Sequence, residues 1–306
     1  MSEGPEVKIT ADKIYNALSD KRAIQGILHN KIDKETKSRI IGSSMEYVKT
    51  FGKNIVVKFS SGVYLRNHMM MWGKWRIYDR EEYDSGLAKP PPRYVYSKNR
   101  DKDAGVVQIK QNHITDVRHD TRVRLALITA DRVLIQFNGP ILQFSFDDPA
   151  YREPIKSLGP DGLSSNYDKD KVRSALKSKP KSTSMLIANA LLDQQIVSGI
   201  GNKYKSEILF LNKTYPFKKV VSLPEHELNE LLLCIPKILS HGYRNNGKTR
   251  TIPDREKSSR DATHWVFGRS GKQCWTCSAK IVSEKKLTSR TTFWCPNCQP
   301  IGIQES

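Results

Sequence analysis

The sequence has few cysteines and no long apolar run. Its 306 residues include 5 cysteines, and hydrophobic residues make up 38% of the chain, below the globular average. No segment approaches the roughly 18 apolar residues of a membrane-spanning helix, and the acidic start Met1–Glu6 is unlike a secretory signal. We therefore expect an intracellular, soluble chain, long enough for two domains, without membrane or secreted disulfide-rich character.

Acidic residues are also scarce. Lys and Arg number 51 against 32 Asp and Glu, which gives a formal net charge of +19. Such a field attracts polyanions, of which DNA, RNA and acidic membranes are the candidates. A basic surface kept for solubility is the alternative. The charge predicts a class of partner but no reaction.

Four of the five cysteines form two closely spaced pairs near the C-terminus. Cys274 and Cys277 make one pair, Cys295 and Cys298 make the other, and residues 278–294 lie between them. Two such pairs are typical of a tetrahedral zinc site with four thiolate ligands, which is structural because no position is left for water. We predict one structural Zn²⁺ in a β-hairpin finger.

The apolar pattern changes along the chain and predicts an α+β fold with two domains. Residues 3–18 have a loose helical stripe, residues 40–146 contain short β-type runs, and helical spacing returns after residue 185. The short strands predict a sandwich or barrel. The predicted parts are a β-sandwich domain with an N-terminal helix (1–148), a linker (149–184), a helical domain (185–262) and a zinc finger (263–306).

Two segments of the helical region carry local signals. Ser222–Glu225 has the form of a capping box, with an apolar stripe from Leu228 to Leu239 after it. Upstream, Gly199–Asn202 is a Gly-x-Gly turn between two helices. Glycines there would let backbone N–H groups at the start of the next helix approach a phosphate, with Asn202 as the first polar side chain to help. A plain helix–helix turn is the alternative.

Four separated segments resemble one protein family. In chain order they are Glu3–Val7, then Gly52–Lys53 with His68–Gly73, then Leu191–Pro216, and finally the finger from Val266 to Gln299. They resemble the catalytic N-terminus, two β-domain motifs, the helix-two-turn-helix and the zinc finger of the formamidopyrimidine-DNA glycosylase and endonuclease VIII group, which includes the Nei-like enzymes. The resemblance covers most of the chain and is weakest between residues 80 and 185.

The resemblance implies a bifunctional DNA glycosylase and AP lyase of base excision repair. Such enzymes flip an oxidised base, here expected to be a pyrimidine, out of the duplex. A terminal amine attacks C1′ to form a Schiff base, and elimination then cuts the strand. The matching catalytic residues are Ser2, whose amine is exposed once Met1 is removed, Glu3 as general acid/base, and Lys53 near the reacting nucleotide.

Three further residues match DNA-binding positions of the family. Asn202 and Arg290 match groups that hold phosphates around the lesion, and Met71 matches a side chain that fills the gap left by the flipped base. Each predicted role has a structural alternative. Glu3 and Lys53 would be ordinary helix and turn residues, Met71 would be core, and Arg290 would neutralise the zinc thiolates.

The sequence departs from the family pattern at two places. The family's usual nucleophile is an N-terminal proline, and Ser2 stands at that position. Between Asn138 and Phe144, bacterial relatives often carry arginines in a loop opposite the lesion, and here Ile141, Leu142 and Gln143 occupy those places. Readout of the opposite base is therefore in question, and single-stranded DNA becomes a possible substrate beside double-stranded DNA.

Two functional hypotheses follow. The first is a monomeric glycosylase and lyase acting on damaged DNA. The alternative is a non-catalytic, zinc-dependent nucleic-acid-binding protein. Only the enzyme explains Glu3 beside Ser2 and a removable Met1.

Overall fold

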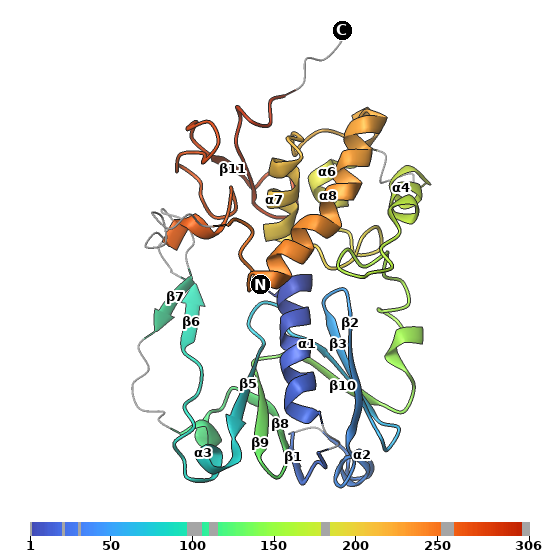
Figure 1. Ribbon diagram of the computed structural model, residues 1–306, viewed down its shortest axis with the longest axis vertical. Coiled ribbons are helices and arrows are strands. Elements are labelled where there is room, and N and C mark those ends of the chain that lie inside the picture. Colours follow the sequence, from blue (N-terminus) through green and yellow to red (C-terminus); the bar gives the residue numbers. More distant parts are fainter. Residues whose placement is uncertain are drawn as a thin grey trace. The chain divides into compact units, whose positions relative to one another are not determined.

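The computed structural model describes residues 2–19, 22–29, 32–96, 106–109, 116–178, 184–251 and 260–301 (Figure 1). Contacts divide the chain into two compact units. The first, here the helix–finger unit, comprises Met1–Ala11, Lys49–Val56 and Asp148–Ser306. The second, the β unit, comprises Asp12–Val48 and Val57–Asp147. The chain passes from one unit to the other within α1, β2 and β3.

Two four-stranded sheets carry the β-rich half of the chain. Their strand orders are β1-β8-β9-β5 and β10-β4-β3-β2, and the pairings of β1 with β8, β8 with β9, β9 with β5 and β10 with β4 are antiparallel. The strands are β1 (Gly26–Leu28), β2 (Met45–Phe51), β3 (Asn54–Phe59), β4 (Tyr64–His68), β5 (Lys74–Asp79), β8 (Val123–Ile128), β9 (Arg132–Phe137) and β10 (Ile141–Ser145). A separate hairpin joins β6 (Arg93–Tyr96) to β7 (Val106–Ile109).

Continuous apolar runs explain the inner strands. Nearly every residue of β3 and β9 is buried, as expected of strands covered on both faces. Phe59, Leu65 and Phe137 are fully buried. Short helices complete this part: α2 (Lys34–Ile40), which Asp33 caps at the N-terminus, and α3 (Arg80–Asp84).

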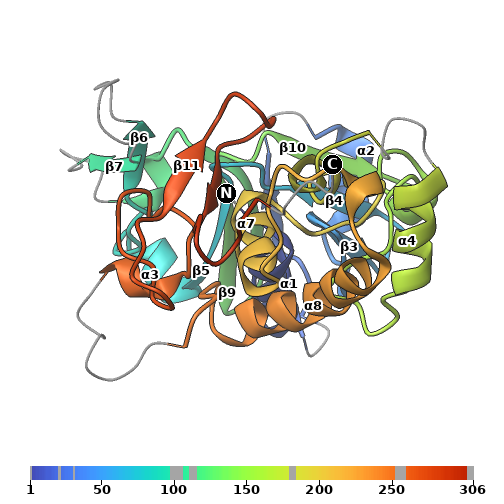
Figure 2. The same ribbon diagram turned by 90° about the horizontal axis from the view of Figure 1, so that it is seen from above.

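The N-terminal helix α1 (Gly4–Leu18) confirms the predicted helix. In the helix–finger unit the helices are α4 (Lys169–Ser178), α6 (Ile187–Ala190), α7 (Asn202–Leu211) and α8 (Glu225–Arg244). Figures 1 and 2 both draw α7 beside α8, and the two are in contact. Gly242 of α8 allows this approach, because a Cβ there would lie 2.1 Å from the Tyr204 hydroxyl oxygen.

Two local expectations differ from the structure. The apolar stripe of α8 is buried as predicted, but the capping box is wrong: the helix begins at Glu225 after Pro224, with no side-chain cap. Ser222 instead ends a short 3-10 turn, Val220–Ser222. The stretch predicted as a linker contains α4, whose Val172 and Leu176 belong to the helical core. Polar surface residues on α4 made this amphipathic helix resemble a linker.

The finger is a β-hairpin, as predicted, of β11 (Val282–Glu284) and β12 (Thr292–Trp294). Its small core contains Val266, Ile281 and two of the cysteines, and Phe210 of α7 packs against them. Among the described residues, no helix combines the length and apolarity that a membrane crossing requires.

Candidate active site and metal centre

The side chain of Glu3 occupies the N-terminus of α7. Its carboxylate is 1% exposed and accepts hydrogen bonds from the backbone N–H groups of Gly201 (3.0 Å), Lys203 (2.9 Å) and Tyr204 (3.1 Å). A Cβ on Gly201 would lie 2.4 Å from the Glu3 carboxyl carbon, so only glycine allows this approach. The expectation that these N–H groups hold a phosphate is therefore wrong, because Glu3 already occupies the positive end of the helix.

Burial raises the pKa of Glu3 above its ordinary value. The positive charge and backbone N–H of Lys203, and the charge of Lys53, oppose this shift, whereas the carboxylate of Glu6 adds to it. A carboxyl group with a raised pKa can give or take a proton closer to neutral pH. The site therefore suits Glu3 to general acid/base chemistry.

Hydrogen bonds of two consecutive backbone N–H groups, those of Glu3 and Gly4, fix the chain at Glu3. The N–H of Gly4 donates to the carbonyl of Gly199 at 2.8 Å, and the N–H of Glu3 donates to Glu6 at 3.2 Å. Glu6 also accepts from the ammonium of Lys203 and, at 3.3 Å, from the hydroxyl of Tyr204. Ser2, which is half-buried, directly precedes this anchored segment.

Lys53 lies in the tight turn between β2 and β3. Gly52 adopts a positive φ of 56° and donates its N–H to Asp161 at 2.8 Å, and Asp161 also accepts from Leu163 at 2.9 Å. Burial lowers the pKa of Lys53, the charge of Glu3 opposes that shift, and the charge of Arg290 adds to it. Lys53 thus lies within electrostatic reach of both Glu3 and Arg290.

The structure also brings Asn202 next to the turn that carries Arg290. The side-chain amide of Asn202 donates to the carbonyl of Thr291 at 2.9 Å, and Arg290 itself is exposed. Five of the six predicted catalytic and DNA-binding residues thus belong to the helix–finger unit.

Met71 belongs to the β unit, in the turn after β4. Of the three consecutive methionines, Met69 is buried, Met71 is half-buried, and Met70 is 47% exposed with a positive φ of 51°. The sequence could not distinguish them because all three have the same side chain.

Three residues of the site were missed in the sequence. Glu6 follows Glu3 at a helical spacing, and this pattern could have indicated that the two carboxylates lie on the same face of the helix. Asp161 lies in a Gly- and Pro-rich stretch that was assigned to the linker. Lys205 is fully buried in α7, and no sequence pattern distinguishes a buried lysine from an exposed one.

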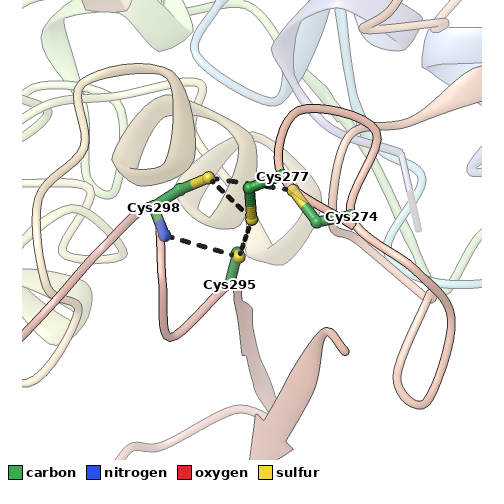
Figure 3. Close-up of side chains that lie close together, drawn as sticks. All are labelled: Cys274, Cys277, Cys295 and Cys298. Carbon is green, nitrogen blue, oxygen red and sulfur yellow. Dashed lines mark hydrogen bonds between the residues drawn. The ribbon is translucent and has the colours of Figure 1, made fainter. Parts of the chain in front are cut away.

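The four paired cysteines converge at one point (Figure 3). Their sulfur atoms all lie within 4.8 Å of one another, with Cys274 and Cys298 3.8 Å apart. Sulfurs about 3.8 Å apart are what a tetrahedral centre with metal–sulfur bonds of about 2.3 Å requires. The cluster therefore fits a metal ion with a closed four-thiolate shell. The fifth cysteine, Cys234, lies in α8.

Known proteins share these features. A family model for the formamidopyrimidine-DNA glycosylase N-terminal domain matches residues 1–137, and one for the formamidopyrimidine-DNA glycosylase H2TH domain matches residues 158–254. The chain is similar to an Endonuclease 8 from Salmonella arizonae, with 26% identity over 304 residues that cover 98% of this chain and 100% of the relative.

The fold is similar to solved structures of a Lactococcus lactis formamidopyrimidine-DNA glycosylase. One, bound to DNA containing an AP site, has a TM-score of 0.73 and 22% identity, covering 98% of this chain and 100% of that chain. Another, in complex with DNA containing an oxidised pyrimidine, has a TM-score of 0.73 and 22% identity, covering 97% and 99%. These likenesses confirm the predicted α+β, two-domain fold class.

Proposed function

We propose that this chain, which belongs to the formamidopyrimidine-DNA glycosylase and endonuclease VIII family, excises oxidised bases through the α-amine of Ser2. Membership of that family makes it a DNA glycosylase with AP lyase activity, acting in base excision repair. One observation carries the assignment of residues. Glu3, which directly follows Ser2, has a buried carboxylate that three backbone N–H groups hold in place.

The proposed first step uses the amine that Ser2 exposes once Met1 is removed. The neutral amine attacks C1′ of the flipped nucleotide while the bond to the damaged base breaks. The amine then loses a proton and the sugar ring opens, which gives a Schiff base at C1′. An α-amine has an ordinary pKa of roughly 7.7–8.0, so a useful fraction is neutral near neutral pH.

Glu3 is proposed to move the protons of this sequence. Opening of the sugar requires a proton at the ring oxygen, and the subsequent elimination requires removal of one from C2′ before the 3′ phosphate leaves. A buried carboxyl group with a raised pKa can serve as donor in the first step and as acceptor in the second. Its three N–H partners hold it in one orientation throughout.

Lys53, Asn202 and Arg290 are proposed to hold the DNA backbone around that nucleotide. Burial lowers the pKa of Lys53, and a phosphate placed beside it would favour the charged form, as the carboxylate of Glu3 does. Arg290 is exposed at the tip of the finger hairpin, where it is free to reach a phosphate with its planar, five-donor guanidinium.

The β unit is proposed to supply the gap-filling side chain and little opposite-base readout. Met71 is the proposed wedge, and Met70 is the more exposed neighbour to test beside it. Ile141–Ser145 forms strand β10, paired with β4, so these residues do not form a loop. This supports activity on single-stranded as well as double-stranded DNA. A monomer is the proposed active form.

The metal is proposed to be one structural Zn²⁺. Four thiolates suit Zn²⁺, and a closed shell supplies folding energy without chemistry at the metal. The site would hold the hairpin that presents Arg290. Oxidised pyrimidines are the proposed lesion class, supported by the Lactococcus lactis relative's complex with DNA of that kind.

A borohydride trapping assay tests the proposal. The protein, with Met1 shown by intact mass to be absent, is incubated with an end-labelled oligonucleotide carrying an abasic site, and borohydride is added. We expect a covalent complex that is lost in Glu3→Gln. Insertion of one alanine before Ser2 shifts the amine by up to about 3.8 Å, and should lower trapping at least about 100-fold while DNA binding persists.

Binding without trapping by the unmodified chain would overturn the assignment of Ser2 and favour the non-catalytic binder. Lys237→Met is a suitable control, since Lys237 is exposed on α8. It removes one positive charge and should trap like the parent protein. Trapping that survives the alanine insertion would indicate that a lysine side chain is the nucleophile, with Lys53 as the first candidate.

A further inference from the structure

Lys205 is a fully buried lysine in the first turn of α7. Its ammonium donates to Oδ1 of Asn202 at 2.7 Å and to Oγ1 of Thr292 at 2.8 Å, with the carbonyl oxygen of Thr291 at 3.5 Å. A lysine ammonium has three donors and no acceptor, and a buried charge is tolerated only when it is hydrogen-bonded. These three oxygens are therefore the site that accommodates it.

The contact with Lys205 decides how Asn202 is oriented. Because Lys205 can only donate, the oxygen of the Asn202 amide faces it, and the amide nitrogen faces the carbonyl of Thr291 at 2.9 Å. One N–H of the Asn202 amide is used in that bond. The other is left pointing in a fixed direction, as a donor for an incoming group.

The same ammonium reaches the turn that carries Arg290. The hydroxyl of Thr288 donates to the carbonyl of Arg290 at 2.6 Å, and Oγ1 of Thr292 lies 3.2 Å from the same carbonyl and 2.9 Å from Oγ1 of Thr288. Since Lys205 donates to Oγ1 of Thr292, the hydroxyl hydrogen of Thr292 is directed into this turn. Lys205 is thus the one group that contacts both Asn202 and the Thr288–Thr292 turn among the hydrogen bonds of the described residues.

We propose that Lys205 is a positioning residue that holds Asn202 and the Arg290-bearing turn in the joint geometry in which they bind the DNA backbone. The inference rests on the proposed function, because it assumes that these two residues bind DNA. An apolar side chain at position 205 would avoid the cost of burying a charge but would leave both partners free to rotate.

Charged groups on two other segments act on Lys205. Burial lowers its pKa to about 7, the carboxylate of Glu3 opposes the shift, and the guanidinium of Arg290 adds to it. A nearby phosphate favours the ammonium in the same way as Glu3 does. We therefore expect DNA binding to be accompanied by proton uptake at Lys205, and affinity to fall as pH rises from about 6 to about 8.

A double-mutant cycle tests the proposal. The dissociation constant is measured for the parent, Lys205→Met, Asn202→Ala and the double variant, on a duplex carrying a tetrahydrofuran abasic-site analogue. Each single change should weaken binding about tenfold, as for loss of a charge-assisted hydrogen bond. The double variant should also bind only about tenfold more weakly than the parent, since Lys205 acts through Asn202.

Two readouts separate positioning from a purely structural role. On cleavable abasic DNA, Lys205→Met should raise KM while kcat at saturating DNA changes by less than about threefold. Its affinity should also lose the pH dependence that the parent shows. Lys237→Met removes the same charge from the exposed face of α8 and should leave both properties unchanged.

Additive losses, about 100-fold in the double variant, would overturn the proposal, as would unaltered affinity in Lys205→Met. If Lys205→Met does not fold, Thr292→Val replaces it in the cycle, because it removes one acceptor of the ammonium at nearly constant volume. Coupling of Thr292→Val to Asn202→Ala supports the proposal, and additivity overturns it. A parent protein that neither binds nor cleaves abasic DNA would instead refute the proposed function.

Discussion

Glu3, Lys53 and Lys205 are ionisable side chains whose pKa values burial shifts toward neutrality. The pKa of Glu3 is raised, and those of the two lysines are lowered. In each case the folded protein disfavours the charged form that water would favour. Ionisable groups held in this way are typical of functional sites, and they reduce the stability of the fold.

The loss of stability that the buried Glu3 carboxyl group causes should depend on pH, and the Glu3→Gln variant should reveal it. Because the folded pKa of Glu3 is raised, the folded state binds more protons than the unfolded state between pH 4.5 and that raised value. The parent therefore loses stability as pH rises through the interval, whereas Gln does not titrate. The Tm of Glu3→Gln minus that of the parent should increase with pH, and thermal unfolding from about pH 4 to pH 8 measures it.

Glu225 provides a matched control of opposite sign. Lys177 and Arg173 lower the pKa of this exposed carboxylate, so its stabilising contribution is lost as pH falls below 4.5. The Tm difference between Glu225→Gln and the parent should therefore fall as pH rises, and only in the acidic range. The effect should be small because exposed ion pairs contribute little. A Tm difference for Glu3→Gln that stays level with pH would contradict the burial of a titrating carboxyl group.

At the scale of secondary-structure elements, the turn before α7 is built to receive Glu3. Gly201→Ala should disrupt it, since the added Cβ would lie 2.4 Å from the Glu3 carboxyl carbon. The φ of Gly201 is −127°, which alanine adopts without strain, so the effect is steric. Displacing the carboxylate should lower the single-turnover rate of base excision by about 100-fold or more, as for loss of a general acid/base.

Gly26→Ala is the control for that substitution. A Cβ at Gly26 would contact only the Ile128 side chain, at 3.4 Å, which is an ordinary van der Waals distance. Excision by this variant should match the parent in the same single-turnover assay. Full activity in Gly201→Ala would show that Glu3 can act without its place at the end of α7.

The elements were predictable where one local pattern decided them. The helices containing Val7 and Leu228, and the strands containing Val57 and Ile135, follow from apolar periodicity. The capping box failed because Ser222 ends a 3-10 turn, so α8 begins after Pro224 without a side-chain cap. At α7 the capping side chain comes from a distant part of the chain. The bonds of Glu3 to Gly201, Lys203 and Tyr204 span about 200 residues, and no local pattern encodes such a contact.

The cluster of four cysteines lies where the finger packs against α7. Phe210 of α7 packs against Cys274 and Cys295, while the helical core around Leu231 is a separate cluster. Removing the metal with a chelator should therefore unfold the finger and leave the helices intact, because small metal domains take their folding energy from the ion. Binding of abasic DNA should fall sharply, while the helical circular dichroism signal should persist.

The metal content of the purified chain checks the stoichiometry. We expect one zinc per chain, lost in Cys277→Ser and retained in Cys234→Ser, since Cys234 is not part of the cluster. Zinc-free protein that binds abasic DNA as tightly as the parent would contradict a role for the metal in presenting Arg290.

At the scale of the whole molecule, the net charge of +19 and the specific phosphate contacts should affect DNA binding in different ways, which its dependence on salt can distinguish. Each phosphate that a side chain neutralises contributes a slope of about −0.9 to the plot of log K against log salt concentration on duplex DNA. The formal charge greatly exceeds the number of phosphates that the site residues can contact. The electric field of the net positive charge should therefore set the rate of association with DNA. The slope of log K against log salt concentration should instead reflect the number of phosphates contacted.

Arg290→Ala should reduce the magnitude of that slope by about 1, because one phosphate contact is lost. Met71→Ala should leave the slope unchanged even if affinity falls, since an apolar wedge releases no counterions. Lys237→Met removes a charge without a predicted contact and should also leave the slope unchanged. Titrations of the abasic duplex between about 50 and 200 mM salt measure all three. Weaker binding by Arg290→Ala at an unchanged slope would show that Arg290 acts by another route, such as neutralising the thiolates of the finger, and not by contacting a phosphate.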